Sequence, residues 1–217
     1  MFHVSVTQPY LLPLLLLAAY LLGSIPFGLL FARIFAKKDV REVGSGNIGA
    51  TNVTRVAGPI PGILTLLFDA GKGALTVLLA ARFMNHNATA MMLAAIFALL
   101  GHCYPVWLRL KGGKGVATGL GVFTALCPIA GLCSLAVFII VVLRWRFVSL
   151  GSVAAAAAMP LLVYLFWVPG HAPPMVIVIG TLFATGLVIY KHDSNLQRLV
   201  QGTEPRFGAD KTEDRSA

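Results

Sequence analysis

A polar, glycine-rich segment has the residue types needed to bind an anion. It runs from Gly44 to Arg55 and reads GSGNIGATNVTR. Glycines let the backbone approach a ligand closely and direct several N–H groups toward one point, which favours anions. The Arg55 guanidinium can hold a phosphate with two hydrogen bonds. We therefore predict a phosphate-binding loop, against the alternative of a flexible linker. Its candidate residues are Ser45, Gly46, Asn47, Gly49, Ala50, Thr51, Asn52 and Arg55.

A second glycine loop carries positive charge. The sequence RLKGGKGVATG covers residues 109–119 and leads into an apolar run that begins at Val116. The N-terminus of a helix presents free N–H groups and the positive end of the helix dipole, which suits a phosphate. The alternative is that the lysines only mark a cytoplasmic loop, but that leaves the flanking glycines unexplained. The candidate residues here are Lys111, Gly112, Gly113 and Lys114.

Three ionisable side chains lie within or at the end of apolar runs. His102 is near the end of the run over residues 88–108. Such a group is a functional candidate, for example as a general base, although it can instead hydrogen-bond a backbone carbonyl and lock the helix packing. Asp69 and Lys72 are three residues apart in another apolar run, and we expect them to form a neutralising structural pair.

Two further pairs lie where apolar runs meet polar segments. Ser149 and Ser152 precede or begin a run, where they can cap a helix or donate to a phosphate, and their spacing favours the cap. His192 and Asn195 follow the last run and share a face if the helix continues. The sequence HD at 192–193 gives only weak support for a Ser-His-Asp triad, because adjacent residues of a helix point in different directions.

The composition is that of a membrane protein. Of the 217 residues, 58% are hydrophobic and 12% are charged, whereas soluble domains average about 25% charged. The net charge of +9 does not indicate nucleic-acid binding, because the basic residues lie between apolar spans rather than on one basic face. The three cysteines have no metal-ligand spacing, and their odd number argues against a disulfide framework. We expect no metal or other cofactor.

The apolar runs predict an all-α, polytopic membrane protein with seven transmembrane helices. The stretch 116–143 is too long for one upright span, so we divide it at Pro128 into a short fourth helix and a fifth. The predicted spans cover about 10–35, 59–82, 88–108, 116–127, 128–143, 150–168 and 173–190.

The distribution of charge predicts the orientation in the membrane. With the N-terminus outside, 15 of the 17 lysines and arginines fall on the cytoplasmic side, which also receives both glycine loops and the C-terminus. Residues 1–202 then form a single membrane domain. Residues 203–217 are polar and charged, and we expect them to be a disordered cytoplasmic tail.

Taken together, these segments resemble the bacterial acyl-phosphate:glycerol-3-phosphate acyltransferase family. The matching segments are GSIPFG from Gly23, GSGNIGATNVTR, DAGKG from Asp69, GHCYP from Gly101, KGGKGVAT, VSLGS and YKHDSNLQRLVQGTE. The resemblance implies a seven-helix enzyme of the bacterial inner membrane with its site facing the cytoplasm. It would transfer a fatty acyl group from acyl phosphate to the 1-hydroxyl of glycerol 3-phosphate, giving lysophosphatidic acid and phosphate, the first step of phospholipid synthesis.

The resemblance also suggests roles for the residues named above. The first loop would cradle one phosphate, Lys111 and Lys114 would add charge, and His192 and Asn195 would orient glycerol 3-phosphate. The candidate catalytic residues are Ser45, Arg55, His102 and Lys114.

The sequence leaves the base and two rival functions open. An H-x-x-x-x-D pair is absent, since Trp107 occupies the fifth position after His102. The hydroxyl proton would therefore pass to His102 or to the leaving phosphate, with nearby donors stabilising the oxyanion. A small transporter of phosphate esters is the main alternative function, but the outer halves of the spans are too apolar to provide a polar path. A purely structural membrane subunit would leave the polar loops unexplained.

Overall fold

The computed structural model describes residues 9–167 and 171–208, which form ten α-helices and one 3₁₀ turn. In chain order these are α1 (Leu11–Gly23), α2 (Phe27–Ala36), α3 (Ala50–Ala57), α4 (Pro59–Phe83), α5 (Ala88–Cys103), η1 (Val106–Leu108), α6 (Val116–Leu126), α7 (Pro128–Trp145), α8 (Val148–Phe166), α9 (Met175–Tyr190) and α10 (Asp193–Val200).

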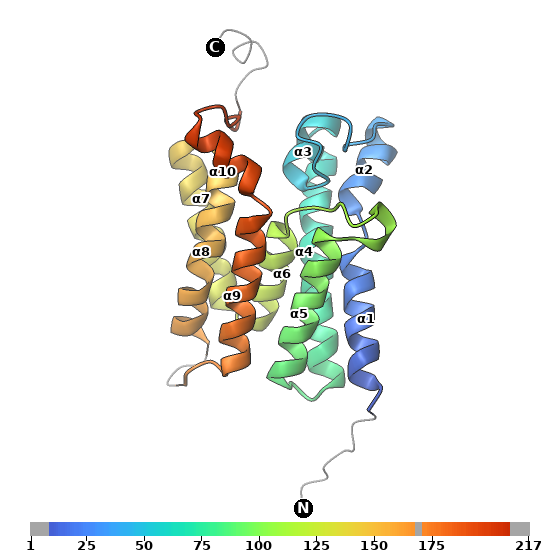
Figure 1. The fold of residues 1–217 in the computed structure, drawn as a ribbon, viewed down its shortest axis with the longest axis vertical. Helices are drawn as coiled ribbons and strands as arrows, with labels where there is room; N and C mark the ends of the chain where they lie inside the picture. Colours follow the sequence, from blue (N-terminus) through green and yellow to red (C-terminus); the bar gives the residue numbers. More distant parts are fainter. Residues whose placement is uncertain (1–8, 168–170, 209–217) are drawn as a thin grey trace, which may run out of the picture.

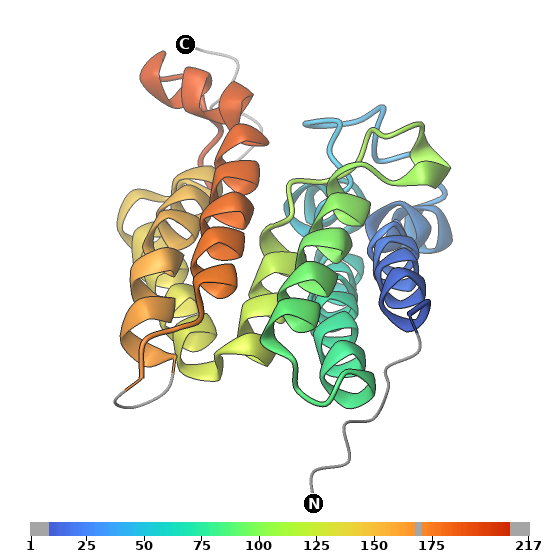
Figure 2. The same ribbon diagram turned by 60° about the horizontal axis from the view of Figure 1, so that its bottom comes forward.

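The long helices lie side by side in a bundle, and the polar segments gather at one end of it (Figure 1). That end holds the loop between α2 and α3, helix α3 itself, the loop between α5 and α6, and α10. We call it the polar end. The turn between α4 and α5 lies at the opposite end, as does the beginning of α1 (Figure 2). The fold therefore brings both predicted phosphate loops to one end of the molecule.

Five helical segments among the described residues are long and apolar enough to cross a membrane. They cover Leu11–Ala36, Pro59–Phe83, Ala88–Leu108, Pro128–Trp145 and Val148–Phe166. Helices α9 and α10, bent by 56° at their junction, supply a sixth if they are counted as one broken span. Helix α6 is apolar but shorter. The all-helical membrane class predicted from the sequence is thus confirmed.

The predicted division at Pro128 is confirmed, because α6 ends at Leu126 and α7 begins at the proline. A proline is well tolerated in the first turn of a helix, where its missing N–H would have no partner anyway.

The first apolar run is broken, which the sequence prediction did not include. Helix α1 ends at Gly23 and α2 begins at Phe27. Pro26 has no N–H to donate to an i−4 carbonyl and its ring crowds the preceding turn, which favours a break at this point. The Ser24 hydroxyl instead donates to the Tyr20 carbonyl at 2.8 Å.

The bundle has apolar side chains on its outside and a polar stripe inside. Leu67, Ile140 and Leu161 are examples of exposed large apolar residues, as expected for a surface that faces lipid. Inside, α4 turns a stripe of buried residues toward its neighbours, including Thr65, Asp69 and Lys72. The sides of the bundle are therefore largely apolar, and the polar residues that could meet both loops lie at the polar end.

Candidate active site

The first glycine loop needs left-handed backbone at two positions. Gly44 and Gly46 have φ of 66° and 68°, a conformation that costs glycine little and other residues more. A Cβ on Gly44 would also overlap the side-chain oxygen of Asn52. These glycines therefore allow the chain to fold tightly over Asn52.

Asn52 organises the loop from within. Its side-chain amide donates to the carbonyls of Val40, Val43 and Asn47 at 2.9–3.0 Å, and its Oδ1 accepts from the Ser45 N–H at 3.0 Å. The residue is 2% exposed. Because its polar atoms are already occupied, Asn52 shapes the predicted phosphate loop rather than presenting a free donor.

Other polar residues of the loop remain available to a ligand. Asn47 is partly engaged, since its Oδ1 accepts from the Gly49 N–H at 2.7 Å. The side chains of Ser45, Thr51 and Arg55 make no hydrogen bond within the described part of the chain. Arg55 is exposed on α3. Residues 50–57 are helical, whereas the prediction from the sequence placed the whole segment in a loop.

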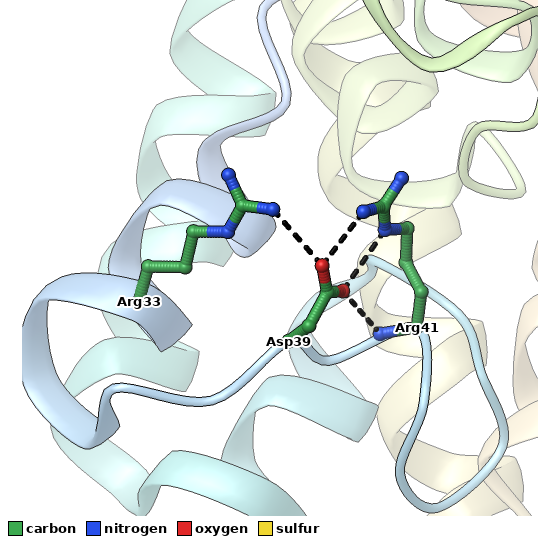
Figure 3. A network of polar contacts seen from close by, with 3 residues as sticks. All are labelled: Arg33, Asp39 and Arg41. Atoms are coloured by element: carbon green, nitrogen blue, oxygen red, sulfur yellow. Dashed lines mark hydrogen bonds and ion pairs between the residues drawn. The ribbon is translucent and has the colours of Figure 1, made fainter.

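An ion network fixes the approach to this loop (Figure 3). Asp39 Oδ2 lies 2.9 Å from Arg33 Nη2 and 2.6 Å from Arg41 Nη2. The Arg41 side chain and N–H also donate to Asp39 Oδ1 at 2.9 and 3.0 Å. These bonds, with that of the Arg41 side chain foremost, hold the pKa of Asp39 well below its usual range. The network stays charged at neutral pH and leads the chain from α2 into the loop.

The second glycine loop lies against the end of α5. The Gly112 N–H donates to the Cys103 carbonyl at 3.2 Å, and the Gly113 N–H donates to the His102 carbonyl at 3.1 Å. Gly113 is buried, and a Cβ on it would overlap the His102 ring. The glycines thus allow the backbone to pass directly over His102 and to position Lys114.

A chain of polar contacts joins this loop to the C-terminal part of the protein. Lys114 donates to the Asn195 side chain, whose amide donates to Glu204 at 2.7 Å. Arg198 also binds Glu204, at 2.8 Å. Burial disfavours the charged form of Glu204, but the nearby Ser149 hydroxyl and the hydrogen bonds from Asn195 and Arg198 keep its pKa below the usual value. Segments distant in sequence therefore meet at Lys114 and Asn195.

Several positively charged side chains lie near Lys114. Burial is the main cause that lowers its pKa, to about 8, and the positive charges of Arg198, Arg55 and Lys191 lower it further, against Glu204. Because the charge of Arg55 lowers the pKa of Lys114, Arg55 on α3 lies close to the second glycine loop. Lys111 is exposed and makes no side-chain hydrogen bond within the described residues. Lys114 thus lies among several cations and one carboxylate, Glu204, an arrangement suited to binding phosphate.

His192 is buried at the junction of α9 and α10. Its Nδ1 donates to the Val188 carbonyl at 2.8 Å, which leaves Nε2 as the ring atom with a free lone pair. The Asn195 N–H donates to the His192 carbonyl in the first turn of α10, and both residues are buried. The helix of the last apolar run does not continue through them, because α9 ends at Tyr190 and His192 is the N-cap of α10.

The predicted cap role of Ser149 and Ser152 is wrong. Helix α8 begins at Val148, so its N-cap is Phe147 and both serines lie inside the helix. Ser152 donates to the Val148 carbonyl at 2.8 Å, a bond that is common for serine within a helix. Ser149 lies beside Glu204. Both serines therefore face the interior of the protein near the C-terminal contacts.

An apolar cavity of about 130 Å³ adjoins this region. It is bounded by residues of α4 to α9, including Phe123, Met159 and Val188. Gly115 and Ser152 also line it. Because Gly115 directly follows Lys114, the cavity begins next to the charged cluster.

Part of the predicted tail is held against the bundle. The Phe207 N–H donates to the Arg146 carbonyl at 2.6 Å, and Arg146 Nε donates back to the Phe207 carbonyl at 3.1 Å. The Arg206 guanidinium lies over the Phe147 ring at 5.7 Å. Glu204, Arg206 and Phe207 therefore tie this segment to the bundle, while 209–217 lie outside the described residues.

Sequence reasoning gave no role to Glu204, Lys191 or Arg198. The signal was present in the segment YKHDSNLQRLVQGTE, which ends on Glu204. Within the described ranges, no cluster of three or more histidine, cysteine or acidic side chains is suited to hold a metal.

Comparison with known proteins identifies the family. Residues 13–202 match the family model described as glycerol-3-phosphate acyltransferase. A glycerol-3-phosphate acyltransferase of Syntrophotalea carbinolica is 50% identical over 196 residues, covering 90% of this chain and 97% of that protein. One of Trichlorobacter lovleyi is 51% identical over 191 residues, covering 88% and 95%.

The fold matches a solved structure of the same kind. The crystal structure of PlsY (YgiH), an integral membrane glycerol 3-phosphate acyltransferase, in its glycerol 3-phosphate form has a TM-score of 0.84 and 39% identity to this chain. It covers 91% of this chain and 96% of that one. The lysophosphatidic acid form has a TM-score of 0.82. The chain belongs to the glycerol-3-phosphate acyltransferase family of integral membrane proteins.

Proposed function

We propose that this protein transfers a fatty acyl group from acyl phosphate to the 1-hydroxyl of glycerol 3-phosphate. The products are lysophosphatidic acid and inorganic phosphate, so the reaction begins phospholipid synthesis. Family membership supports an acyltransferase over the alternatives of a phosphate-ester transporter and a structural subunit. It acts without a metal or other cofactor.

The observation that carries the proposal is that the cluster of cations around Lys114 lies next to the apolar cavity. The loop residue Gly115 lines the apolar cavity, and Lys114 before it belongs to the cluster of cations. Acyl phosphate and lysophosphatidic acid both join a phosphate group to an apolar chain. A site of this kind can therefore hold the head of such a molecule in the loops and its chain among α4 to α9.

The two phosphates are assigned to different loops. The first loop, with Ser45, Thr51 and Arg55 free to donate, holds the head of acyl phosphate. Lys114, with Lys111 beside it, holds the phosphate of glycerol 3-phosphate. His192 accepts a hydrogen bond from the glycerol through its free Nε2, and Asn195 keeps Lys114 in place.

In the reaction the 1-hydroxyl oxygen attacks the acyl carbonyl carbon, and the bond between that carbon and the phosphate oxygen breaks. The hydroxyl proton passes to the leaving phosphate, which is basic enough to need no strong protein base. Arg55 and the loop N–H groups stabilise the negative charge that develops on the carbonyl oxygen and the leaving group. The protein thus contributes positioning and charge rather than a covalent intermediate.

The donor assay tests this function. Purified protein with palmitoyl phosphate and radiolabelled glycerol 3-phosphate is expected to form lysophosphatidic acid in the presence of EDTA. Palmitoyl coenzyme A is expected to give no product, because the described chain has no domain to hold the nucleotide and the sequence has no H-x-x-x-x-D pair. Efficient turnover with coenzyme A as the carrier, or a requirement for added metal, would overturn the assignment.

We further propose seven crossings of the inner membrane, with the N-terminus outside and the polar end in the cytoplasm. Counting α6 as a short span and α9 as the last supplies the two crossings beyond the five long ones. Basic residues at the polar end agree with the positive-inside rule.

Cysteine labelling tests the orientation. In a variant whose three native cysteines are replaced by alanine, Asn85→Cys in the α4–α5 turn is expected to react with an impermeant thiol reagent in spheroplasts. Lys38→Cys, in the loop after α2, is expected to react only after permeabilisation. The reverse pattern, or equal labelling of both positions in intact spheroplasts, would rule out this topology.

A further inference from the structure

A buried ionic cluster inside the bundle has no part in the proposed chemistry. It consists of Asp69 and Lys72 on α4 and His102 on α5, all of which are 2–5% exposed. Asp69 and Lys72 form the predicted ion pair, with Oδ1 and Nζ 2.7 Å apart. Charges buried in a membrane bundle are costly, and a pair can often be replaced by apolar residues without loss of stability. The cluster therefore calls for a function beyond holding the helices together.

One side of the cluster is connected to the first loop. Lys72 Nζ donates to the Ile25 carbonyl at 2.8 Å, at the break between α1 and α2. That break sets where α2 begins. In its first turn, Gly28 lies so close to the Ile48 carbonyl that a Cβ on Gly28 would overlap it. Ile48 belongs to the first glycine loop, so α2 packs directly against that loop and a shift of α2 would move it.

The other side of the cluster is connected to the second loop. His102 Nδ1 lies 3.6 Å from Asp69 Oδ1 and has no hydrogen-bond partner among the described residues. The opposite edge of the ring, with Nε2, is packed against the Gly113 backbone, and the His102 carbonyl accepts from the Gly113 N–H. The His102 ring therefore fixes the position of the Gly113 backbone, and with it the position of the adjacent residue Lys114.

We infer that Asp69, Lys72 and His102 form one positioning cluster that sets the separation of the two phosphate loops. The inference rests on the proposed function for the assignment of substrates to loops. His102 acts through Gly113 and Lys114 rather than on the reacting atoms, since the loop backbone lies directly against its ring. Lys72 supports the first loop through its hydrogen bond to the Ile25 carbonyl. Asp69 supports the His102 ring, because its Oδ1 lies beside Nδ1.

The test at His102 separates positioning from general-base catalysis. His102→Ala is expected to raise KM for glycerol 3-phosphate about tenfold while kcat falls no more than about threefold. His102→Gln fills part of the ring's space and is expected to recover most of the loss in KM. His86→Ala, an exposed histidine at the opposite end of the bundle, serves as the matched control. A fall in kcat of about a hundredfold that His102→Gln does not recover would instead show a general base and overturn the inference.

A second variant keeps the test decisive if His102→Ala fails to fold. The double change Asp69→Leu with Lys72→Met removes both buried charges together, so neither is left unpaired. It is expected to remain folded and to raise KM about tenfold for both acyl phosphate and glycerol 3-phosphate, because both loops lose support. Unchanged KM for both substrates would overturn the inference. A wild-type protein without acyl-phosphate activity would instead count against the proposed function, which distinguishes the two failures.

Discussion

Arg55→Ala is expected to lower kcat/KM roughly 30- to 1,000-fold while the protein stays folded and inserted. The guanidinium is exposed on α3 and makes no hydrogen bond within the described chain, so its removal takes little from the fold. In the proposed mechanism it stabilises the charge that develops on the leaving phosphate, a contact worth about 2–4 kcal/mol. Initial rates in detergent, together with the thermal midpoint, measure both effects.

Two related variants sharpen this result. Arg55→Lys keeps the charge but loses the two parallel hydrogen bonds of a guanidinium, and it is expected to fall between wild type and Arg55→Ala. Arg82→Ala removes an exposed arginine from the other end of α4 and is expected to leave kcat/KM unchanged. Near-normal turnover in Arg55→Ala would exclude the first glycine loop from the site and leave the linker interpretation.

Lys114→Met is expected to lower kcat/KM roughly 10- to 150-fold. In the proposed function the ammonium donates a hydrogen bond to the phosphate of glycerol 3-phosphate, and a bond to a charged group contributes about 1.5–3 kcal/mol. The loss is expected mainly as a higher KM for that substrate. Lys38→Met removes an exposed lysine from the loop after α2 and is the control. A loss confined to KM for acyl phosphate would reverse the assignment of substrates to loops.

The same residue predicts a pH dependence. The pKa of Lys114 is lowered to about 8, so the ammonium is present below that pH and is lost above it. Log kcat/KM is therefore expected to fall above pH 8 with a slope near −1, and this limb is expected to vanish in Lys114→Met. Persistence of the limb in that variant would assign it to another group. Because the folded pKa lies below the ordinary 10.5, the contribution of Lys114 to the free energy of unfolding increases between pH 8 and 10.5. Titration of Lys114 therefore lowers activity without promoting unfolding.

The local pattern of the sequence was enough to predict the class of fold. Apolar runs long enough to cross a bilayer are a property of consecutive residues, because every backbone polar group in lipid must be satisfied within its own helix. Pro128 likewise marked the division between α6 and α7, since a proline has no N–H to continue a helix. Pro26 is a comparable signal for the break between α1 and α2. It was not recognised because it lies within a continuous apolar run.

The two glycine loops could also be recognised locally, whereas the roles within them could not. Small residues next to donors indicate an anion site whatever the fold. Only the folded loop distinguishes Asn52, which is fully engaged with the backbone, from Arg55, which is free. Both residues have polar side chains in the same short segment, and the difference between them is which way each faces on α3.

The sequence by itself therefore determined the apolar helices, their order and the two polar glycine loops proposed to bind phosphate. The tertiary structure alone decided which side chains meet. Lys114, Asn195 and Glu204 are separated by up to 90 positions, and they form one chain of contacts only because α6 to α9 return the polypeptide to the same end of the bundle. The physical reason is that helical periodicity follows from neighbouring residues, whereas an active site depends on long-range packing that no local pattern records.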